Sequence, residues 1–259
     1  MSAKNVVAPL ISVVIPVYRT GEVLRKTLDA LLNVDYPKEK IEIIFSYYPD
    51  PDDSLTPNII KEFRRRNRNK YFGIKVLKRE KQGTSYGRNL GIKNSNGDYI
   101  FVLDDDIIIH RDTFKHALKL FEDPEVAMVN FMCLSPKPSI VEEIEVIPYK
   151  VRIARYGGAK GCAMIRKRVL DEVGLYDERL GPPYGSHEDY ELGLRISKRY
   201  KVLIDGTLTQ IHLGSKKRKI DSAESRCFIN SAKGRLKYYF TRGAETFHII
   251  LLNLSLIHI

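Results

Sequence analysis

The sequence predicts an α/β protein with a central, mostly parallel sheet flanked by helices. Short apolar runs alternate with amphipathic segments from Ile11 onward, and this alternation is typical of parallel sheets that are covered on both faces. The chain has 259 residues, of which 43% are hydrophobic. It therefore has enough apolar side chains for a substantial core.

Four apolar runs in the first half have the length and the β-branched content of buried strands. They are ISVVIPV (11–17), IEIIFSY (41–47), GIKVLK (73–78) and DYIFVL (98–103). Helices are expected between them, at residues 20–34, 57–68 and 84–95. In the first of these helices Leu24, Leu28 and Leu31 lie on one face, as packing on a sheet requires.

The second half is less regular. Strands are expected at 126–134, 161–167, 201–205 and 208–214, and helices at 167–174 and after a glycine- and proline-rich loop near residue 185. Residues 139–156 form a mixed, partly helical pattern. The last 45 residues are basic and amphipathic, and they end in an apolar run.

Three consecutive acids follow the strand at 98–103, and they are the strongest indication of a ligand site. Asp104, Asp105 and Asp106 lie at the carboxyl end of that strand, which is where open α/β sheets bind ligands. Crowded carboxylates repel one another, whereas Mg²⁺ or Mn²⁺ prefers oxygen ligands and shares them with substrate phosphates. The alternative is a turn with a helix cap, in which Asp is common.

Other phosphate-binding motifs are absent from the sequence. The first strand is not followed by G-x-G-x-x-G, and G-x-x-x-x-G-K-[ST] does not occur, which argues against dinucleotide redox enzymes and P-loop NTPases. A second acidic pair, Glu188 and Asp189, opens a predicted helix. With Ser186 this pair also fits a helix capping box, so a structural role and a catalytic role both remain open.

Charge and cysteine content restrict the partners and the compartment. The chain carries 43 Lys and Arg against 32 Asp and Glu, a net charge of +11, which favours anionic partners. Its three cysteines show no pairing or zinc spacing, so we expect a reducing, cytoplasmic location. The tail either lies on anionic lipid as a peripheral contact or packs on the domain; a third alternative is that the sequence is truncated there.

Five segments together resemble the family-2 glycosyltransferases with the GT-A fold. They are residues 11–44, REKQGTSYGRNLGIKNSNGDYIFVLDDD (79–106), GAKGCAMIRKRVLDEVGLYDERL (158–180), HEDYELGLRI (187–196) and IHLG (211–214). None is specific alone, but their order and spacing are. The resemblance implies a Rossmann-like GT-A domain at residues 1–215, with a nucleotide-binding half at about 10–106 and an acceptor and catalytic half at 107–215, followed by the tail at 216–259.

The resemblance also implies roles for individual residues. Asp189, in its pair with Glu188, would deprotonate the acceptor hydroxyl, and a divalent cation, Mg²⁺ or Mn²⁺, would neutralise the departing diphosphate. The implied metal ligands are Asp104, Asp106 and His212, and the residues implied in nucleotide-sugar binding are Pro16, Val17, Tyr18, Tyr47, Gly83, Arg88, Asp104 and Asp105. The expected donor is a nucleoside-diphospho sugar and the expected acceptor a glycan, lipid-linked or other hydroxyl.

Two departures from the family pattern affect this interpretation. Tyr47 and Tyr48 occupy positions at the end of the second strand where acids are usual, so either the acids act from Asp50 onward or the tyrosines stack on the base. The chain contains no Trp, which excludes the Q-x-x-R-W motif of processive synthases and favours transfer of one sugar per encounter. The resemblance implies that this transfer inverts the anomeric centre. The alternatives are a nucleotidyl- or phosphoryl-transfer enzyme, or an inactive basic module that binds lipid or nucleic acid; nucleic acid is not expected as a partner.

Overall fold

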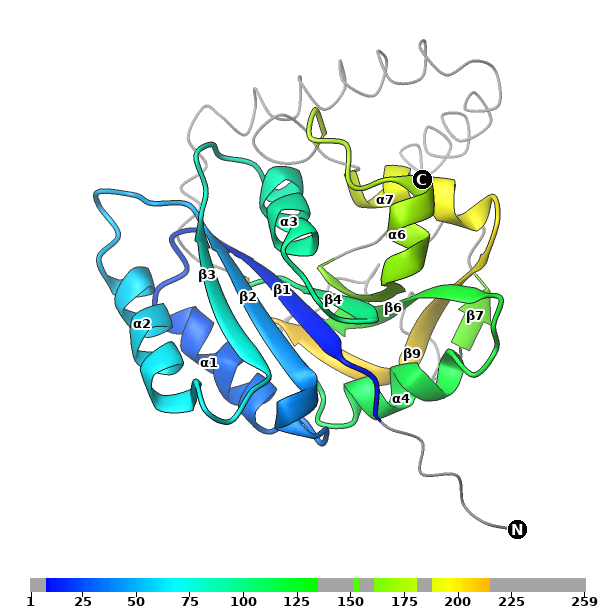
Figure 1. Cartoon of the computed structure of the whole chain (residues 1–259), viewed down its shortest axis with the longest axis horizontal. Coiled ribbons are helices and arrows are strands. Elements are labelled where there is room, and N and C mark those ends of the chain that lie inside the picture. The colour runs from blue at the N-terminus through cyan, green and yellow to red at the C-terminus, as the bar shows by residue number, and fades with distance from the viewer. Residues whose placement is uncertain (1–7, 135–150, 154–160, 181–187, 215–259) are drawn as a thin grey trace, which may run out of the picture.

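The computed structural model describes residues 8–134, 151–153, 161–180 and 188–214, which form an α/β sandwich around one sheet (Figure 1). The strand order is β3-β2-β1-β4-β8-β6-β9-β5, and β7 pairs with β9 at one side. Ser186, the loop before it and the tail at 216–259 lie outside the described residues. The predicted α/β class, with a central sheet flanked by helices, is confirmed.

The first half of the sheet is parallel, as predicted. It consists of β1 (Ile11–Val17), β2 (Ile41–Tyr47), β3 (Gly73–Lys78) and β4 (Tyr99–Leu103). The connecting helices are α1 (Glu22–Leu32), α2 (Leu55–Asn67) and α3 (Thr84–Lys93), with a short 3-10 turn, η1, at Lys38–Lys40. Their bounds agree with the expected segments within a few residues.

The second half differs from the expected parallel arrangement. It consists of β5 (Ile107–Ile108), β6 (Val126–Leu134), β7 (Val151–Ile153), β8 (Cys162–Arg166) and β9 (Lys201–His212). Strand β8 runs antiparallel to β4 and β6, and β9 runs antiparallel to β5 and β7. The other four of the eight pairings among described strands are parallel. The sheet is therefore mixed rather than mostly parallel.

Two further expectations about the second half are corrected. The strands expected at 201–205 and 208–214 form one strand, β9, which follows β6 in parallel with irregularities in register. The sequence pattern also missed helix α4 (Thr113–Leu120), whose Phe114 and Ala117 are fully buried. The remaining helices, α6 (Lys167–Val173) and α7 (Glu188–Ser197), begin where expected.

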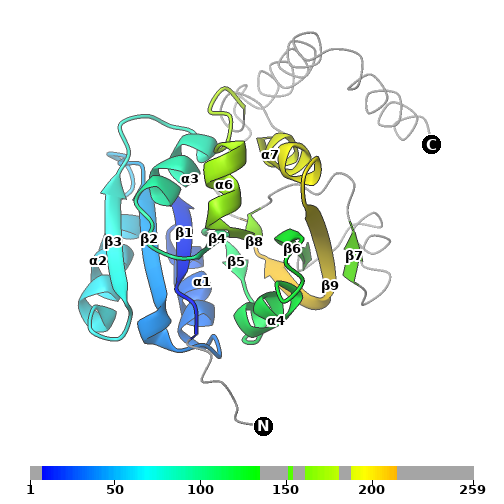
Figure 2. The same ribbon diagram turned by 45° about the vertical axis from the view of Figure 1, so that its right-hand side comes forward.

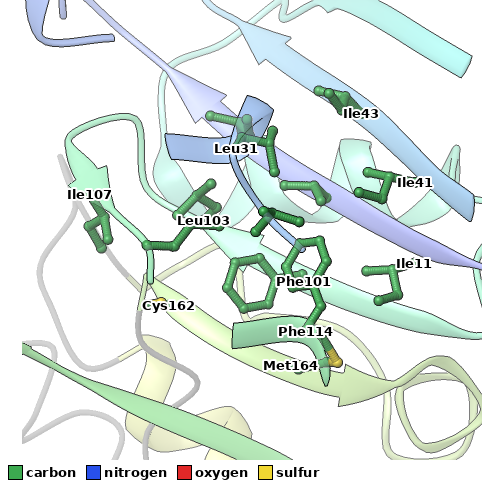
Figure 3. Packing of buried hydrophobic residues seen from close by; sticks show 14 of the residues in the cluster. Ile11, Leu31, Ile41, Ile43, Phe101, Leu103, Ile107, Phe114, Cys162 and Met164 are labelled. Carbon is green, nitrogen blue, oxygen red and sulfur yellow. The ribbon is translucent and has the colours of Figure 1, made fainter. Parts of the chain in front are cut away.

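Helices cover both faces of the sheet. Side chains of α1, α2 and α4 join one apolar cluster, whereas α3, α6 and α7 join the other, and these three helices lie close together in Figure 2. Figure 3 shows the first cluster, in which the rings of Phe101 and Phe114 meet edge to face at 5.0 Å between centroids. None of the described helices is both long enough and apolar enough to cross a membrane.

Helix α3 lies unusually close to β1 because two of its glycines face the sheet. A Cβ atom on Gly91 would lie 2.4 Å from Val14 Cγ1, and one on Gly87 would lie 3.2 Å from Pro16 Cβ. Any larger residue would push the helix away from the strand. This approach fixes the position of Arg88, which lies between the two glycines in sequence.

A buried carboxylate, that of Glu42, links β1, β2 and β3 near the amino ends of β1 and β2. Glu42 is fully buried and accepts hydrogen bonds from Ser12 Oγ at 2.6 Å and from the Asn96 amide nitrogens at 2.7 and 2.8 Å, while Lys75 Nζ lies at 2.7 Å. Burial alone would raise the pKa of Glu42, but these partners together lower it. The ionised form is thus the one that the fold stabilises.

We expect Glu42→Gln to lower the free energy of unfolding at pH 7 by about 2 kcal/mol, because charge-assisted hydrogen bonds are lost. The pKa of Glu42 is lower in the folded protein than its unfolded value of about 4.5. The stability that this difference provides is fully present above the unfolded pKa and is lost as the pH falls through the folded pKa. Urea unfolding should therefore show a constant difference between wild type and variant above about pH 5.5, one pH unit above that unfolded value, and a narrowing difference in acid. The exposed Glu39→Gln is the matched control; an undiminished difference at pH 3 contradicts the prediction.

Candidate active site

The carboxyl ends of β1 and β4 meet because these strands are parallel neighbours, with Val14 opposite Val102. The loop after β1 is tied to the acids after β4 through Asp105. Tyr18 N donates to Asp105 Oδ2 at 3.1 Å and Thr20 Oγ1 donates to the same oxygen. Asp105 thus holds the loop in place, and burial of its carboxyl group raises its pKa to about 7.

Asp106 and His212 come together although they are far apart in the sequence. Strand β5 pairs antiparallel with the end of β9, with Ile107 opposite His212, and this pairing brings His212 Nε2 to 3.1 Å from Asp106 Oδ1. The hydrogen bond with Asp106 raises the pKa of His212 more than burial lowers it. Two of the three predicted metal ligands are therefore adjacent.

Asp104, the third predicted ligand, points toward α3. Arg88 Nη2 donates to Asp104 Oδ1 at 3.0 Å, and Asp104 N donates to Gly161 O at 2.7 Å. Only glycine fits at position 161, since a Cβ atom there would lie 1.8 Å from Asp104 Oδ2. The Asp104 side chain is 31% exposed, so part of it remains accessible at the site.

These residues fit a cation that is shared with a ligand better than a cation held by protein alone. Within the described ranges, no group of three or more His, Cys, Asp and Glu side chains is arranged to hold a metal ion. Asp106 and His212 provide an oxygen and a nitrogen donor close together. Mg²⁺ and similar ions are commonly bound by one or two carboxylates together with substrate phosphates, so this two-donor set suits a metal diphosphate.

The acidic pair predicted for catalysis lies at the first turn of α7. Glu188 is buried, and Arg88 Nη1 donates to its Oε1 at 3.0 Å. Burial raises the pKa of Glu188, and Arg88 opposes that rise. Asp189 is only partly buried and forms no ion pair with a residue in the described part of the chain. Of the two acids, Asp189 is therefore the one available to a substrate.

Aromatic and charged side chains surround the ends of β1 and β2. Tyr18 is 41% exposed, its ring meets Tyr48 edge to face at 5.7 Å, and its hydroxyl donates to Asp50 at 3.0 Å. Arg19 has a φ of +50°, a strained value for a non-glycine residue, and pairs with Asp50 and Asp52. Asp50 is thus occupied in holding the β1 loop.

The other residues predicted to bind the nucleotide contribute less directly. The side chains of Pro16 and Val17 are buried, so only Tyr18 of that segment presents an exposed side chain. Tyr47, at the end of β2, is partly buried. Gly83, with a φ of +126°, begins the turn into α3.

Arg79 is a site residue that the sequence interpretation missed. It is buried, and its guanidinium donates to Val17 O at 2.7 Å and to Gly83 O at 2.9 Å. Burial lowers its pKa to about 10. Arg79 fastens the turn before α3 to β1 and lies 5.8 Å from the Tyr48 ring. The signal was present, because Arg79 opens the matching segment at 79–106.

Fold and site together define an α/β protein with a cluster of acids at the carboxyl ends of its central strands. The sequence pattern of glycosyl transferase family 2 matches residues 12–174, and the chain belongs to this family.

Several relatives of the chain are named as glycosyltransferases. An uncharacterized glycosyltransferase of Rickettsia felis is 25% identical over 87% of this chain and 38% of its own length. Glycosyltransferase AglE of Haloferax volcanii is 30% identical over 66% of this chain and 57% of its own length. A dolichyl N-acetyl-α-D-glucosaminyl phosphate 3-β-D-2,3-diacetamido-2,3-dideoxy-β-D-glucuronosyltransferase of Methanococcus voltae is 28% identical over 56% of this chain and 45% of its own length. The chain thus spans about half the length of these curated relatives.

Solved structures share the fold. A mannosyltransferase from Pyrobaculum calidifontis in complex with GDP-Man and Mn²⁺ gives a TM-score of 0.65 at 14% identity, over 98% of this chain and 82% of that one. Staphylococcus aureus TarS in complex with UDP-GlcNAc gives a TM-score of 0.64 at 19% identity, over 83% of this chain and 61% of that one. At these identities the likeness demonstrates the GT-A architecture alone.

Proposed function

We propose that the chain is an inverting, non-processive glycosyltransferase that moves a sugar from a nucleoside-diphospho sugar to an acceptor hydroxyl. The observation that carries the proposal is the network around Arg88. One buried guanidinium contacts Asp104, beyond β4, and Glu188, at the start of α7. The acids suited to a metal diphosphate and the acid suited to an acceptor therefore belong to one site, and family membership supports the same reaction.

On the donor side, Asp106 and His212, with Asp104, are the residues that would hold Mg²⁺ or Mn²⁺. Such a cation supplies electrostatic stabilisation of the negative charge that develops on the departing diphosphate. The mannosyltransferase complex with GDP-Man and Mn²⁺ supports this choice of ion. Tyr18, held by Asp50 and Asp105, and its neighbour Tyr48 offer aromatic surface for the nucleotide.

On the acceptor side, Asp189 takes the proton of the attacking hydroxyl. General-base catalysis of this kind contributes about 10²- to 10⁴-fold to the rate. The hydroxyl attacks the anomeric carbon from the face opposite the diphosphate, so a single displacement inverts the configuration at that carbon. Glu188 does not compete for this role, because its carboxylate is buried against Arg88.

The acceptor that we propose is a glycan, a lipid-linked sugar or another hydroxyl compound. The Methanococcus voltae relative is named for transfer to a dolichyl-linked sugar phosphate, which supports a lipid-linked acceptor and a peripheral contact with an anionic membrane. Cys133 and Cys162 are both free thiols, in keeping with a reducing, cytoplasmic location.

A thermal-shift screen of nucleotide sugars tests the donor side of this proposal. At a donor concentration about 100 times its Kd, binding adds about 2.7 kcal/mol to the stability, so the Tm should rise by several degrees with Mn²⁺ and the correct donor. UDP-GlcNAc and GDP-mannose are the first two probes, each with and without Mn²⁺. EDTA should abolish the rise. The absence of any cation-dependent rise with UDP-, GDP-, CDP- and dTDP-sugars contradicts the proposal.

A further inference from the structure

The most deeply buried charge in the site belongs to Arg88, and both of its terminal nitrogens contact acids. The residue is 3% exposed. Its Nη1 and Nη2 atoms donate to Glu188 and Asp104, both at 3.0 Å, and its Nε has no hydrogen-bond partner among the described residues. A guanidinium enclosed in this way is poorly placed to bind donor phosphates, which is one of the roles that the family resemblance allows it.

The surroundings of Arg88 hold it rigidly. Its guanidinium lies 5.2 Å from the centroid of the Tyr176 ring, a distance at which a cation is attracted to a ring face. The next residue, Asn89, fixes that platform, because Tyr176 N donates to Asn89 Oδ1 at 3.0 Å and Asn89 Nδ2 donates to Tyr176 O at 2.9 Å. The close packing of α3 on β1 at Gly91 sets the base of the side chain.

The charge balance explains why both acids depend on Arg88. Burial lowers the pKa of Arg88, but Asp104 and Glu188 raise it further than burial lowers it, so the guanidinium stays charged. Without this charge, Glu188 would be a buried carboxylate that pairs with no cation of the described residues and lies near a second carboxylate. Uncompensated charges of this kind strongly destabilise the fold around them.

We infer that Arg88 is a positioning residue that couples Asp104, an acid on the nucleotide-sugar side of the site, to the first turn of α7. It does so without touching the nucleotide sugar. Glu188 is the first residue of α7 and Asp189 the second, so the Arg88–Glu188 pair sets the direction in which Asp189 points. The Arg88–Asp104 pair sets the carboxylate on the donor side in the same way. A single side chain thereby fixes the distance between Asp104 on the nucleotide-sugar side and Asp189 on the acceptor side. This role rests on the proposed function.

The kinetic test uses Arg88→Lys, which keeps the positive charge. Lysine presents a point charge instead of the planar guanidinium that contacts both acids. We expect kcat to fall about a hundredfold, the scale of a displacement of about 1 Å in a catalytic group. The Kd for the nucleotide sugar selected in the thermal-shift screen, measured without divalent cation so that the metal ligand Asp104 does not contribute, should change less than about threefold. The control is Arg166→Lys, because Arg166 also bonds through its fork and stacks on Tyr99 and Phe121, but outside the site. A loss expressed mainly in the Kd measured without divalent cation identifies Arg88 as a ligand of the nucleotide sugar and overturns the inference.

A second test does not need activity. Urea unfolding is compared for wild type, Glu188→Gln, Arg88→Met and the double variant. Glu188→Gln should destabilise the protein when Arg88 is present, because the ion pair is lost, and stabilise it when position 88 is Met, because a lone buried carboxylate is removed. The same sign in both backgrounds overturns the coupling, even if the wild type transfers sugar. A reversal of sign in a protein that transfers no sugar upholds the contact but refutes the proposed function.

Discussion

Asp189→Asn is expected to lower the turnover of sugar transfer by about 10²- to 10⁴-fold, the contribution of a positioned general base. The amide is nearly isosteric with the carboxylate but cannot accept the proton of the acceptor hydroxyl. Because Asp189 is partly exposed at the first turn of α7 and pairs with no cation in the described ranges, the substitution should leave the fold intact. Turnover is measured with saturating donor and acceptor, and stability by thermal unfolding.

Donor binding separates this role from a structural one. The Kd for the nucleotide sugar and its dependence on Mn²⁺ should be unchanged in Asp189→Asn, since the base acts on the acceptor. Asp171→Asn is the matched control, because Asp171 is an exposed acid on α6 whose one ion pair within the described ranges is with Lys167, one turn away. Full turnover by Asp189→Asn refutes its role as the base.

Asp106→Asn is expected to abolish transfer by a different route, through loss of cation-dependent donor binding. Removing even a group that only orients a metal ligand costs about 10- to 100-fold in affinity, so we expect the affinity for the donor with Mn²⁺ to fall by at least about tenfold. The measurement is titration calorimetry of the nucleotide sugar with and without Mn²⁺. Donor affinity without the cation should be nearly the same in variant and wild type.

His212 provides an internal check on the Asp106 experiment. The carboxylate of Asp106 raises the pKa of His212, so in Asp106→Asn the imidazole should titrate at a lower pH, which NMR can follow. Asp112→Asn, an exposed acid six residues further on, is the control and should bind donor like wild type. Cation-dependent binding that survives in Asp106→Asn would exclude this carboxylate as a ligand.

Local patterns in the sequence were sufficient for most of the secondary structure. Runs such as ISVVIPV predicted strands within a residue or two of their bounds, because apolar periodicity reports which residues face a core. Helix α4 was missed although Phe114, Ala117 and Leu118 have helical spacing, because the helix has only eight residues and its apolar pattern is correspondingly short. The antiparallel course of β8 was also missed, because strand direction depends on the path of a connection and not on the strand's own residues.

The sequence and the family resemblance named candidate site residues, but they did not predict the contacts among those residues. The sequence indicated Asp104, Asp106 and His212 as one group, and the structure brings Asp106 and His212 within hydrogen-bonding distance. It did not indicate that Asp105 turns inward to hold the β1 loop, nor that Arg79 joins that loop to the turn before α3. Neighbouring residues at the end of a strand point in different directions, and the turn that follows decides which one meets a ligand.

The sequence by itself determined the α/β architecture, the strand that ends in three acids, and the family to which the chain belongs. Only the tertiary structure decided that Arg88 is enclosed between Asp104 and Glu188, which lie 84 positions apart in the sequence. The physical reason is that periodicity and turn chemistry are local properties of the chain. Which acids share one buried cation depends instead on how the helices pack on the sheet, and here on the two glycines that let α3 approach β1.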